Sequence, residues 1–408
     1  MYTTISGGVC AAQGFRAAGL HVGVKTHNVN KKDVALIVSD APCTAAAVFT
    51  KNVVKAAPVL VTKAHLEKGG IRAIIANSGN ANACAPNGEE NAVRMCAAAA
   101  KAIGCAPEEV LVASTGVIGQ TLKVEAIENG VPELYSLLAS SGAASDAAAH
   151  AIMTTDTVKK EFAAEVLIGG KPVRIGGIAK GSGMIHPNMG TMLCFLTTDC
   201  AISKEMLEMA LGEVVRMTFN RISVDGDTST NDTCCILANG LAGNPEIREM
   251  DERYVDFVMK LHEVCYSLAR MMAKDGEGAK HLITCTVRGA ASEEQAETIS
   301  KSVISSTLTK AAIFGCDANW GRVLCAMGYS GESFDPGKVD VSFASDAGDI
   351  LVCQNGQGLA FDEELAKKIL SEDEVDIDIT IQEGEESCTC WGCDITYDYI
   401  KINGDYRT

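Results

Sequence analysis

The dipeptide Gly190-Thr191 could perform chemistry on its own peptide bond. Glycine adopts backbone conformations that are closed to other residues, so a strained bond can lie here, and the Thr191 hydroxyl can reach the Gly190 carbonyl. Attack by that hydroxyl would convert the peptide bond into an ester, and water would then release a chain that begins with Thr191. A threonine with a free α-amine is an activated nucleophile, because the amine accepts the hydroxyl proton. The dipeptide alone is weak support, since Gly-Thr before an apolar run is most often a loop that enters a strand.

Two further polar sequences could complete a site for acyl transfer. Thr115-Gly116 follows a short apolar run, 110–113, that we predict to be a strand. A hydroxyl and a backbone N–H at the end of a strand can point at one position and stabilise an oxyanion, although the same residues are ordinary in turns. The sequence 153–157, Met-Thr-Thr-Asp-Thr, is a dense cluster of hydroxyl groups.

Other polar sequences resemble metal or nucleotide sites without meeting their spacing. The loop 223–233 alternates carboxylates but lacks the distal glutamate of an EF-hand. The sequence 388–393 contains CxxC and His65 begins HxE, yet no fourth zinc ligand is evident, and buried thiols on a strand are the better interpretation. A P-loop and a complete dinucleotide fingerprint are both missing. We therefore expect no metal and no nucleotide cofactor.

The composition favours a compact α/β enzyme. The chain has 408 residues, a length that allows a large core in two or three lobes. Its 47% hydrophobic residues and 39 glycines are typical of this class. With 35 basic and 52 acidic residues the formal charge is −17, so nucleic acid is not an expected partner. The 17 cysteines are scattered through apolar stretches, which suits reduced thiols in a cytoplasmic protein. We find no targeting signal and no membrane span of about 18 to 20 apolar residues.

Periodicity predicts the elements that must position these groups. The stretches 165–168 and 173–178 read as a hairpin that ends near Lys180, and 251–272 has the clearest helical period in the chain. A capping box at Ser292 opens another helix, and we place a lobe boundary near Gly289. Further strands are predicted at 33–38, 58–62, 71–76, 191–196, 339–343, 376–382 and 394–402.

Several longer blocks of the sequence resemble those of the ornithine acetyltransferases, also called glutamate N-acetyltransferases, of arginine biosynthesis. The resemblance extends over almost the whole chain. Its blocks are GFRAAGLHVGVK at 14–25, IIANSGNANAC at 74–84, STGVIG at 114–119, IMTTDT at 152–157, KGSGMIHPNMGTML at 180–193, DANWGRV at 317–323 and the C-terminal YIKINGDYRT at 399–408.

This resemblance implies an αββα sandwich of the N-terminal-nucleophile type with a second α/β lobe. It also implies self-cleavage between Gly190 and Thr191, giving an α chain (1–190) and a β chain (191–408) that stay associated, as a heterotetramer of two α and two β chains. Thr191 would be the nucleophile, and Thr115 and Gly116 would form the oxyanion hole. The positions that match the family's substrate contacts are Thr154, Lys180, Thr191, Glu277, Asn403 and Thr408.

The reaction that the resemblance implies moves an acetyl group from N-acetylornithine to glutamate. Both are α-amino acids, so one cation can hold their shared carboxylate, and Lys180 is the candidate. Acetyl-CoA stays open as a second donor, although no segment shows a recognisable CoA site. Two alternatives also stay open: an amidase or aminopeptidase of similar architecture in which water accepts the acyl group, and a thiol-rich metal-binding or scaffold protein without catalysis.

Overall fold

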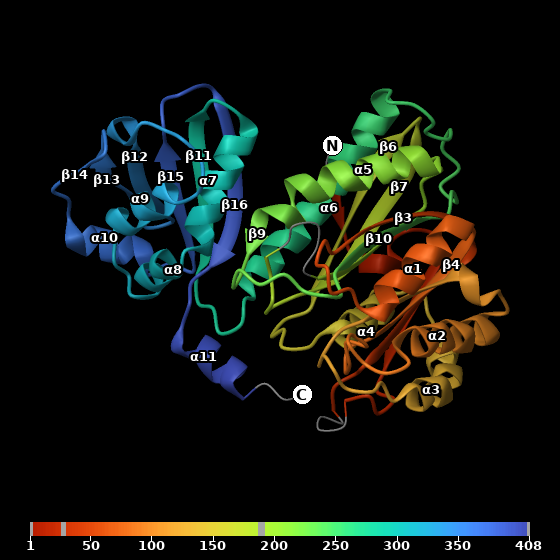
Figure 1. Ribbon diagram of the computed structural model, residues 1–408. Helices are drawn as coiled ribbons and strands as arrows, with labels where there is room; N and C mark the ends of the chain where they lie inside the picture. Colours follow the sequence, from red (N-terminus) through yellow and green to blue (C-terminus); the bar gives the residue numbers. More distant parts are fainter. Residues whose placement is uncertain (1–2, 26–29, 187–191, 406–408) are drawn as a thin grey trace.

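The computed structural model describes residues 3–25, 30–186 and 192–405, which form two lobes (Figure 1). In the first lobe, the described residues form a nine-stranded sheet with the order β1-β6-β7-β8-β10-β3-β4-β5, and β2 pairs with β3 off this path. Its strands are β1 (Thr3–Ile5), β2 (Phe15–Leu20), β3 (Val34–Phe49), β4 (Ile71–Asn77), β5 (Val110–Ser114), β6 (Lys160–Ile168), β7 (Lys171–Lys180), β8 (Leu193–Thr198) and β10 (Thr233–Ala238).

The long strand β3 divides this sheet into two halves. Its first part pairs with β2 and β4, while its last part, from Thr44 to Phe49, pairs with β10. The pairing with β4 shifts register between Val38 and Cys43, where the strand passes from one half to the other. Because side chains alternate along a strand, each half offers one face to the other half and one to the outside.

The two halves pack face to face, and helices cover their outer faces. Leu193 and Phe195 of β8 share a core with Ile37 of β3 and Ile74 of β4. The alternate residue Leu196 packs instead with α5 and α6, and Leu36 packs with α2 and α3. The helices of this lobe are α1 (Ala57–Lys68), α2 (Gly88–Ile103), α3 (Val124–Ser136), α4 (Gly142–Ile152), α5 (Lys204–Met217) and α6 (Glu252–Lys274). This arrangement is an αββα sandwich, which confirms the predicted fold class.

In the second lobe, the residues that the structure describes form a seven-stranded sheet with helices on one face. Its order is β14-β13-β12-β15-β11-β16-β9, and its core is shared with α7, α9 and α10. Its strands are β9 (Ile222–Ser223), β11 (Leu282–Ala290), β12 (Asp340–Ser345), β13 (Gly348–Gln354), β14 (Gln357–Gly358), β15 (Glu374–Thr380) and β16 (Glu386–Cys393). Its helices are α7 (Glu293–Ser305), α8 (Thr307–Phe314), α9 (Trp320–Gly328), α10 (Glu363–Leu370) and the C-terminal α11 (Tyr397–Gly404).

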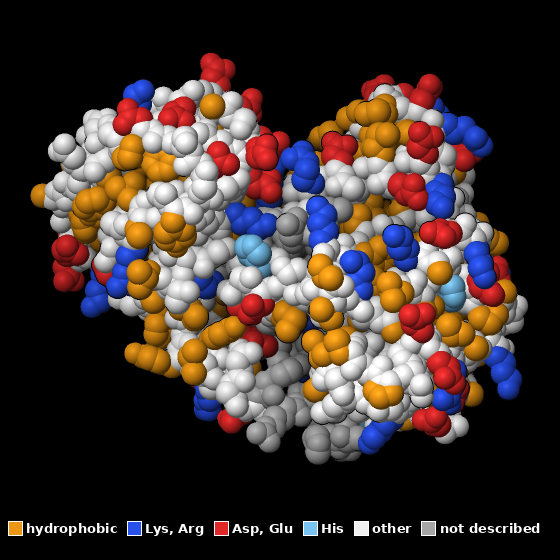
Figure 2. All heavy atoms as spheres, viewed as in Figure 1, with side chains coloured by type: hydrophobic (Ala, Val, Ile, Leu, Met, Phe, Trp, Pro, Cys, Tyr) orange, Lys and Arg blue, Asp and Glu red, His pale blue; other side chains and the backbone are white. Residues whose placement is uncertain are grey.

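Contacts between the lobes include those of α6 and the ion pairs that Arg216 and Arg221 form with Glu293 of α7. Trp391 and Cys393 of β16 belong to the same core cluster as α6, and β9 pairs in parallel with β16. Figure 2 shows a hollow between the two lobes on the face drawn, where acidic and basic side chains are interspersed. The sequence predicts a lobe boundary near Gly289. In the structure, Gly289 lies inside β11, a strand of the second sheet that begins at Leu282.

Two of the predicted strands are helices. Pro58–Thr62 lies in the first turns of α1, where a proline near the N-terminus is tolerated because its missing N–H has no partner in a helix. The predicted strand at 394–402 overlaps α11, which Thr396 caps by accepting a hydrogen bond from the Asp398 N–H. By contrast, the structure confirms the hairpin and the long helix that periodicity predicts, as β6–β7 and α6. No helix of the described residues is long and apolar enough to span a bilayer.

Candidate active site

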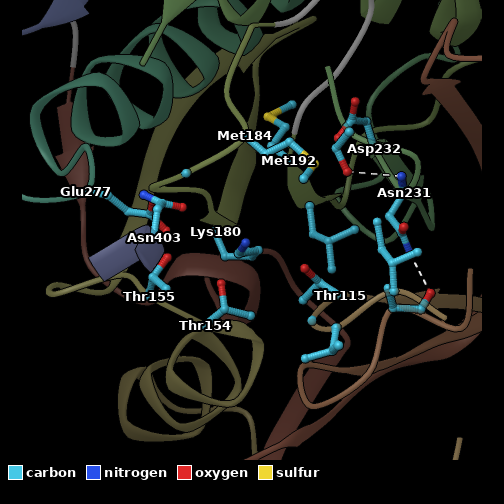
Figure 3. Close-up of a pocket in the computed structure, with 17 residues that line it drawn as sticks. Thr115, Thr154, Thr155, Lys180, Met184, Met192, Asn231, Asp232, Glu277 and Asn403 are labelled. Carbon is cyan, nitrogen blue, oxygen red and sulfur yellow. Dashed lines mark hydrogen bonds between the residues drawn. The ribbon is translucent and has the colours of Figure 1, made fainter. Parts of the chain in front are cut away.

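A cavity of about 300 Å³ collects most of the predicted site residues (Figure 3). Thr115, Gly116, Thr154, Lys180, Glu277 and Asn403 all line it. They come from segments that are far apart in the sequence: the end of β5, the turn after α4, the end of β7, the turn after α6, and α11. Gly190, Thr191 and Thr408 lie outside the described residues, but Met192 and Leu193, which follow Thr191 directly, line the same cavity.

The strand pairing explains why these segments meet. In the antiparallel pair of β7 and β8, Lys180 lies opposite Leu193. In the parallel pair of β8 and β10, Leu193 lies opposite Thr233, and the Thr233 N–H donates to the Met192 carbonyl at 2.9 Å. The end of β7 and the beginnings of β8 and β10 therefore meet at one edge of the sandwich.

Thr115 and Gly116 are held at this edge by the loop after β4. The Thr115 N–H donates to the Asn77 carbonyl at 2.9 Å, and Asn80 forms a bridge with Thr115. Gly116 has φ 130°, and a Cβ there would lie 2.7 Å from the backbone nitrogen of Asn80. Only glycine fits this position, because any side chain would both strain the backbone and displace the neighbouring loop.

The buried Lys180 side chain has no direct counter-ion among the described residues. In the part of the chain that the structure describes, no hydrogen bond or ion pair is formed by its Nζ, and the residue is only 7% exposed. Burial lowers the pKa of Lys180, and Lys160 lowers it further, while the carboxylates of Asp156 and Glu277 partly offset this effect. A ligand carboxylate in the cavity would supply the missing negative charge.

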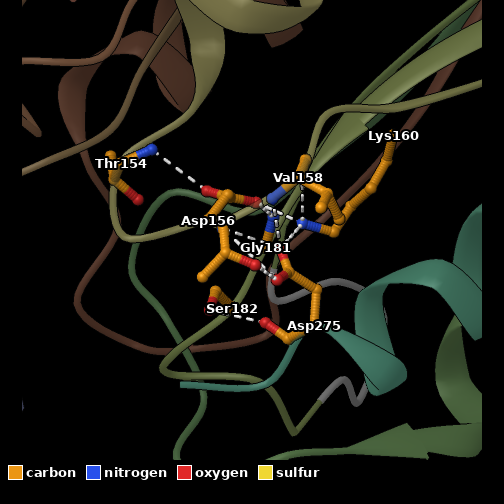
Figure 4. A network of polar contacts seen from close by, with 8 residues as sticks. Thr154, Asp156, Val158, Lys160, Gly181, Ser182 and Asp275 are labelled. Carbon is orange, nitrogen blue, oxygen red and sulfur yellow. Dashed lines mark hydrogen bonds and ion pairs between the residues drawn. The ribbon is translucent and has the colours of Figure 1, made fainter. Parts of the chain in front are cut away.

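A buried ion-pair network adjoins residues that line the cavity (Figure 4). Lys160 Nζ lies 2.7 Å from Asp156 Oδ1 and 2.5 Å from Asp275 Oδ2, and its side chain is 0% exposed. The Asp156 carboxylate also accepts the N–H groups of Thr154 at 3.0 Å and Gly181 at 2.8 Å. The network thus fixes the residues next to Lys180 and Glu277, together with Thr154 itself.

Glu277 and Asn403 line the side of the cavity opposite Thr115 (Figure 3). Asn403 Nδ2 donates to Glu277 Oε2 at 2.7 Å, and the Glu277 N–H donates to the Ser182 carbonyl at 3.0 Å. A Cβ at Gly183 would lie 2.3 Å from the Glu277 carboxyl carbon. The glycine-rich segment after β7 therefore leaves room for this carboxylate. Its side chain lines the cavity together with Lys180 and Asp232, so the site offers one basic and two acidic side chains to a substrate with both charges.

The sequences that resemble metal sites have structural contacts. His65 Nδ1 lies 2.7 Å from the Val110 carbonyl oxygen, and Cys388 and Cys390 are buried in the core of the second lobe. Asp225 of the polar loop accepts the N–H groups of Met184 at 2.6 Å and Ile185 at 2.9 Å. Among the described residues, His, Cys, Asp and Glu side chains nowhere gather in a group of three that could hold an ion.

Three acidic or basic residues at the site were not singled out from the sequence. Lys160 and Asp275 meet across 115 residues, a pairing that no local pattern signals. Asp232 lines the cavity beside Asn231, and both belong to the polar loop 223–233, whose carboxylates lack the spacing of a calcium site. The one signal for Asp232 was its position at the end of this loop, immediately before an apolar run typical of a strand.

Comparison with known proteins identifies the family. The sequence model of the ArgJ family matches residues 16–408. The chain belongs to the ArgJ family. It is 51% identical over 395 residues to arginine biosynthesis bifunctional protein ArgJ 1 of Clostridium acetobutylicum, covering 97% of this chain and 96% of the relative. It is 50% identical over 405 residues to ArgJ of Symbiobacterium thermophilum, covering 99% of each.

A solved ArgJ structure resembles part of the chain. The crystal structure of arginine biosynthesis bifunctional protein ArgJ from Bacillus halodurans is 41% identical, with a TM-score of 0.50, and the match covers 52% of this chain and 98% of that one. These matches confirm the family predicted from the sequence blocks. The protein is therefore an enzyme of arginine biosynthesis, an acyltransferase.

Proposed function

We propose that the enzyme transfers the acetyl group of N2-acetylornithine to glutamate through an acetyl-Thr191 intermediate. The observation that carries this proposal is the single cavity lined by six of the predicted residues, next to the start of β8. Thr191 is bonded directly to Met192, which lines this cavity.

The proposed cycle needs no group beyond the chain's own residues and its two substrates. The Thr191 oxygen attacks the acetyl carbonyl, the developing oxyanion is stabilised at Thr115 and Gly116, and the Thr191 amine takes the hydroxyl proton. The carbon–nitrogen bond then breaks, and ornithine leaves with that proton. The glutamate amine attacks the acetyl ester in the second half of the cycle and releases the Thr191 hydroxyl.

The charges in the cavity support α-amino acid substrates. Lys180, which has no counter-ion among the described residues, would bind the carboxylate that ornithine and glutamate share. Glu277, oriented by Asn403, would bind the side-chain ammonium of ornithine. Thr154 and Thr408 would complete the substrate contacts.

Self-cleavage at Gly190-Thr191 would supply the amine that the cycle requires. The relative length of the solved Bacillus halodurans chain supports such a cut, because 52% of this chain matches 98% of that one, whereas the curated relatives match along nearly their full length. The two products, 1–190 and 191–408, would stay together because the last six residues of β7, in the first product, pair with β8 of the second. A heterotetramer of two α and two β chains is the proposed assembly.

The first experiment is the intact mass of the purified protein under denaturing conditions, alongside Thr191→Ala. We expect two fragments that meet at Gly190 and Thr191, and one uncut, inactive chain in the variant. An uncut wild-type chain that still transfers acetyl groups would refute the proposal that the free α-amine of Thr191 is the base. With labelled N-acetylornithine, N-acetylglutamate should form without stoichiometric acetate; acetate as the main product would favour an amidase.

Binding of the shared carboxylate can be tested by Lys180→Ala on protein that has cleaved itself. We expect KM for both substrates to rise at least about 10-fold, since a charge-assisted hydrogen bond contributes about 1.5–3 kcal/mol. Unchanged KM values would remove Lys180 from this role.

A second activity, acetylation of glutamate by acetyl-CoA, is favoured by the word bifunctional in the names of both curated relatives. It would use the same acetyl-Thr191 intermediate without a bound cofactor. Incubation with acetyl-CoA and glutamate, in the absence of N-acetylornithine, tests it through release of free thiol.

A further inference from the structure

The ammonium group of Lys25 joins three segments that are far apart in the sequence. Its Nζ donates to the Lys32 carbonyl at 3.0 Å, to the Ser78 hydroxyl at 2.7 Å and to the Met153 carbonyl at 2.7 Å. An ammonium has three N–H donors, so these three neutral oxygens use all of them. Burial lowers the pKa of Lys25 to about 8. Because removing a charge from water costs free energy, the position of this ammonium calls for a reason.

The contact with Ser78 fixes the loop against which Gly116 packs. The Ser78 hydroxyl accepts from Lys25 and donates to the Ala151 carbonyl at 2.5 Å. Gly79 follows Ser78 directly, and a Cβ at Gly116 would lie 2.8 Å from the Gly79 carbonyl carbon. A displacement of Ser78 and Gly79 would therefore also displace Gly116.

The contact with Met153 fixes the peptide unit that leads into Thr154. Lys25 binds the carbonyl oxygen of this unit, and the Asp156 carboxylate accepts its N–H group, which belongs to Thr154, at 3.0 Å (Figure 4). A peptide unit is planar, so contacts at both of its ends set its orientation. This orientation in turn directs the side chain of Thr154, which lines the cavity.

The backbone of Lys25 is itself held by a buried carboxylate. Asp33 is 0% exposed and accepts the N–H groups of Lys25 at 3.0 Å, Gly23 at 3.2 Å and Val22 at 2.7 Å. The same backbone lies close to the neighbouring loop, because a Cβ at Gly79 would lie 3.0 Å from the Lys25 nitrogen. The Lys25 side chain therefore extends from a fixed base, and it does not line the cavity.

We propose that Lys25 is a positioning residue, which fixes the oxyanion hole relative to Thr154. The inference rests on the proposed function, in which Thr115 and Gly116 stabilise the oxyanion and Thr154 contacts the substrate. Lys25 acts through the two segments that it joins and touches neither the substrate nor the reacting atoms.

The charged groups that we propose for substrate binding lie on other segments. Lys180 ends β7, and Glu277 accepts a hydrogen bond from Asn403. Loss of the Lys25 ammonium should therefore change substrate binding little. It should lower kcat strongly, because the oxyanion develops only on the way to the transition state and a misplacement of about 1 Å can cost about 10²-fold in rate.

The test is Lys25→Met, which keeps a side chain of similar length but has no donor. In steady-state kinetics of acetyl transfer from N-acetylornithine to glutamate, kcat per cleaved chain should fall about 10²-fold, with both KM values within about 3-fold of wild type. Lys31→Met is the matched control, because it removes the same charge from a nearby exposed residue. This control should keep the wild-type kcat and KM.

Ser78→Ala tests one of the three contacts while Lys25 stays in place. We expect kcat to fall at least about 10-fold at an unchanged KM, since a hydrogen bond to a charged group is lost. The double variant, Lys25→Met with Ser78→Ala, should be no slower than Lys25→Met alone, because both changes break the same connection. If the two effects multiply instead, the proposal is overturned.

Three further results bear on the proposal. A wild-type kcat in Lys25→Met, or a KM that rises while kcat is kept, would contradict a positioning role. If Lys25→Met does not fold, Ser78→Ala decides, and an unchanged kcat in that variant overturns the proposal. Wild-type protein that transfers no acetyl group from N-acetylornithine to glutamate would instead refute the proposed function, so the two failures are distinguishable.

Discussion

Replacing Lys160 by methionine should destabilise the protein by about 3–5 kcal/mol at neutral pH. Methionine has a similar length but no charge. The Lys160 side chain is 0% exposed and lies 2.7 Å from Asp156 Oδ1 and 2.5 Å from Asp275 Oδ2. The variant therefore leaves two buried carboxylates without their shared cation, and the expected loss is the cost of an unpaired buried charge.

The neighbouring Lys159 provides a matched control. Its side chain is 35% exposed and pairs on the surface with Asp146 and Glu161. Lys159→Met should cost less than about 1 kcal/mol, because exposed ion pairs are screened by solvent. Both changes remove one positive charge. The difference between their effects on the free energy of unfolding therefore measures how much the ion pair depends on burial.

Chemical denaturation on the Thr191→Ala background is the assay, because every variant is then expected to be one uncut chain. Burial raises the pKa of Asp156, but Lys180, Lys160 and the Thr154 N–H lower it more, so the pKa of this carboxyl lies below its ordinary value. A depressed folded-state pKa contributes stability above the unfolded pKa, near 3.9, and that stability is lost as the pH falls.

Without Lys160 the pKa of Asp156 should rise, because the lost cation lowered it, and protonation of Asp156 should relieve the cost of its unpaired charge. The stability difference between Lys160→Met and its parent should therefore shrink as the pH falls from 7 toward about 4. A difference below about 1 kcal/mol at pH 7, or one that does not change with pH, would refute this reasoning.

Two further predictions concern the cavity. Gly116→Ala should lower kcat at least about 10²-fold in cleaved protein, because its Cβ would meet the Asn80 nitrogen at 2.7 Å and displace an oxyanion-hole donor; an unchanged kcat would contradict this role. Asn403→Ala should raise KM for N-acetylornithine about 10-fold with little change in kcat, because Glu277 loses the hydrogen bond that orients it at 2.7 Å. Steady-state kinetics with both substrates would check each, and a larger effect on glutamate would reassign Asn403.

The elements with strong periodicity could be predicted from the sequence. Helix α6 begins after the capping residue Asp251 and buries the apolar positions that its period indicates. The prediction of a strand at 58–62 was wrong, because β-branched residues favour strands locally while packing of α1 against β5 decides the outcome. Helix α11 was missed because it has no buried residue, and so no apolar face appears in its sequence.

The sequence alone identified the family, the dipeptide suited to self-cleavage, and the types of residue that acyl transfer needs, because each of these depends only on short stretches of sequence. It could not bring Thr115, Lys180, Glu277 and Asn403 into one cavity, because they lie on distant segments that only long-range strand pairing and hydrogen bonds bring together. Nor could it show that Asp232 has an unpartnered oxygen, which depends on burial by residues distant in the chain. Charge and burial become properties of a site only when the sandwich closes around it.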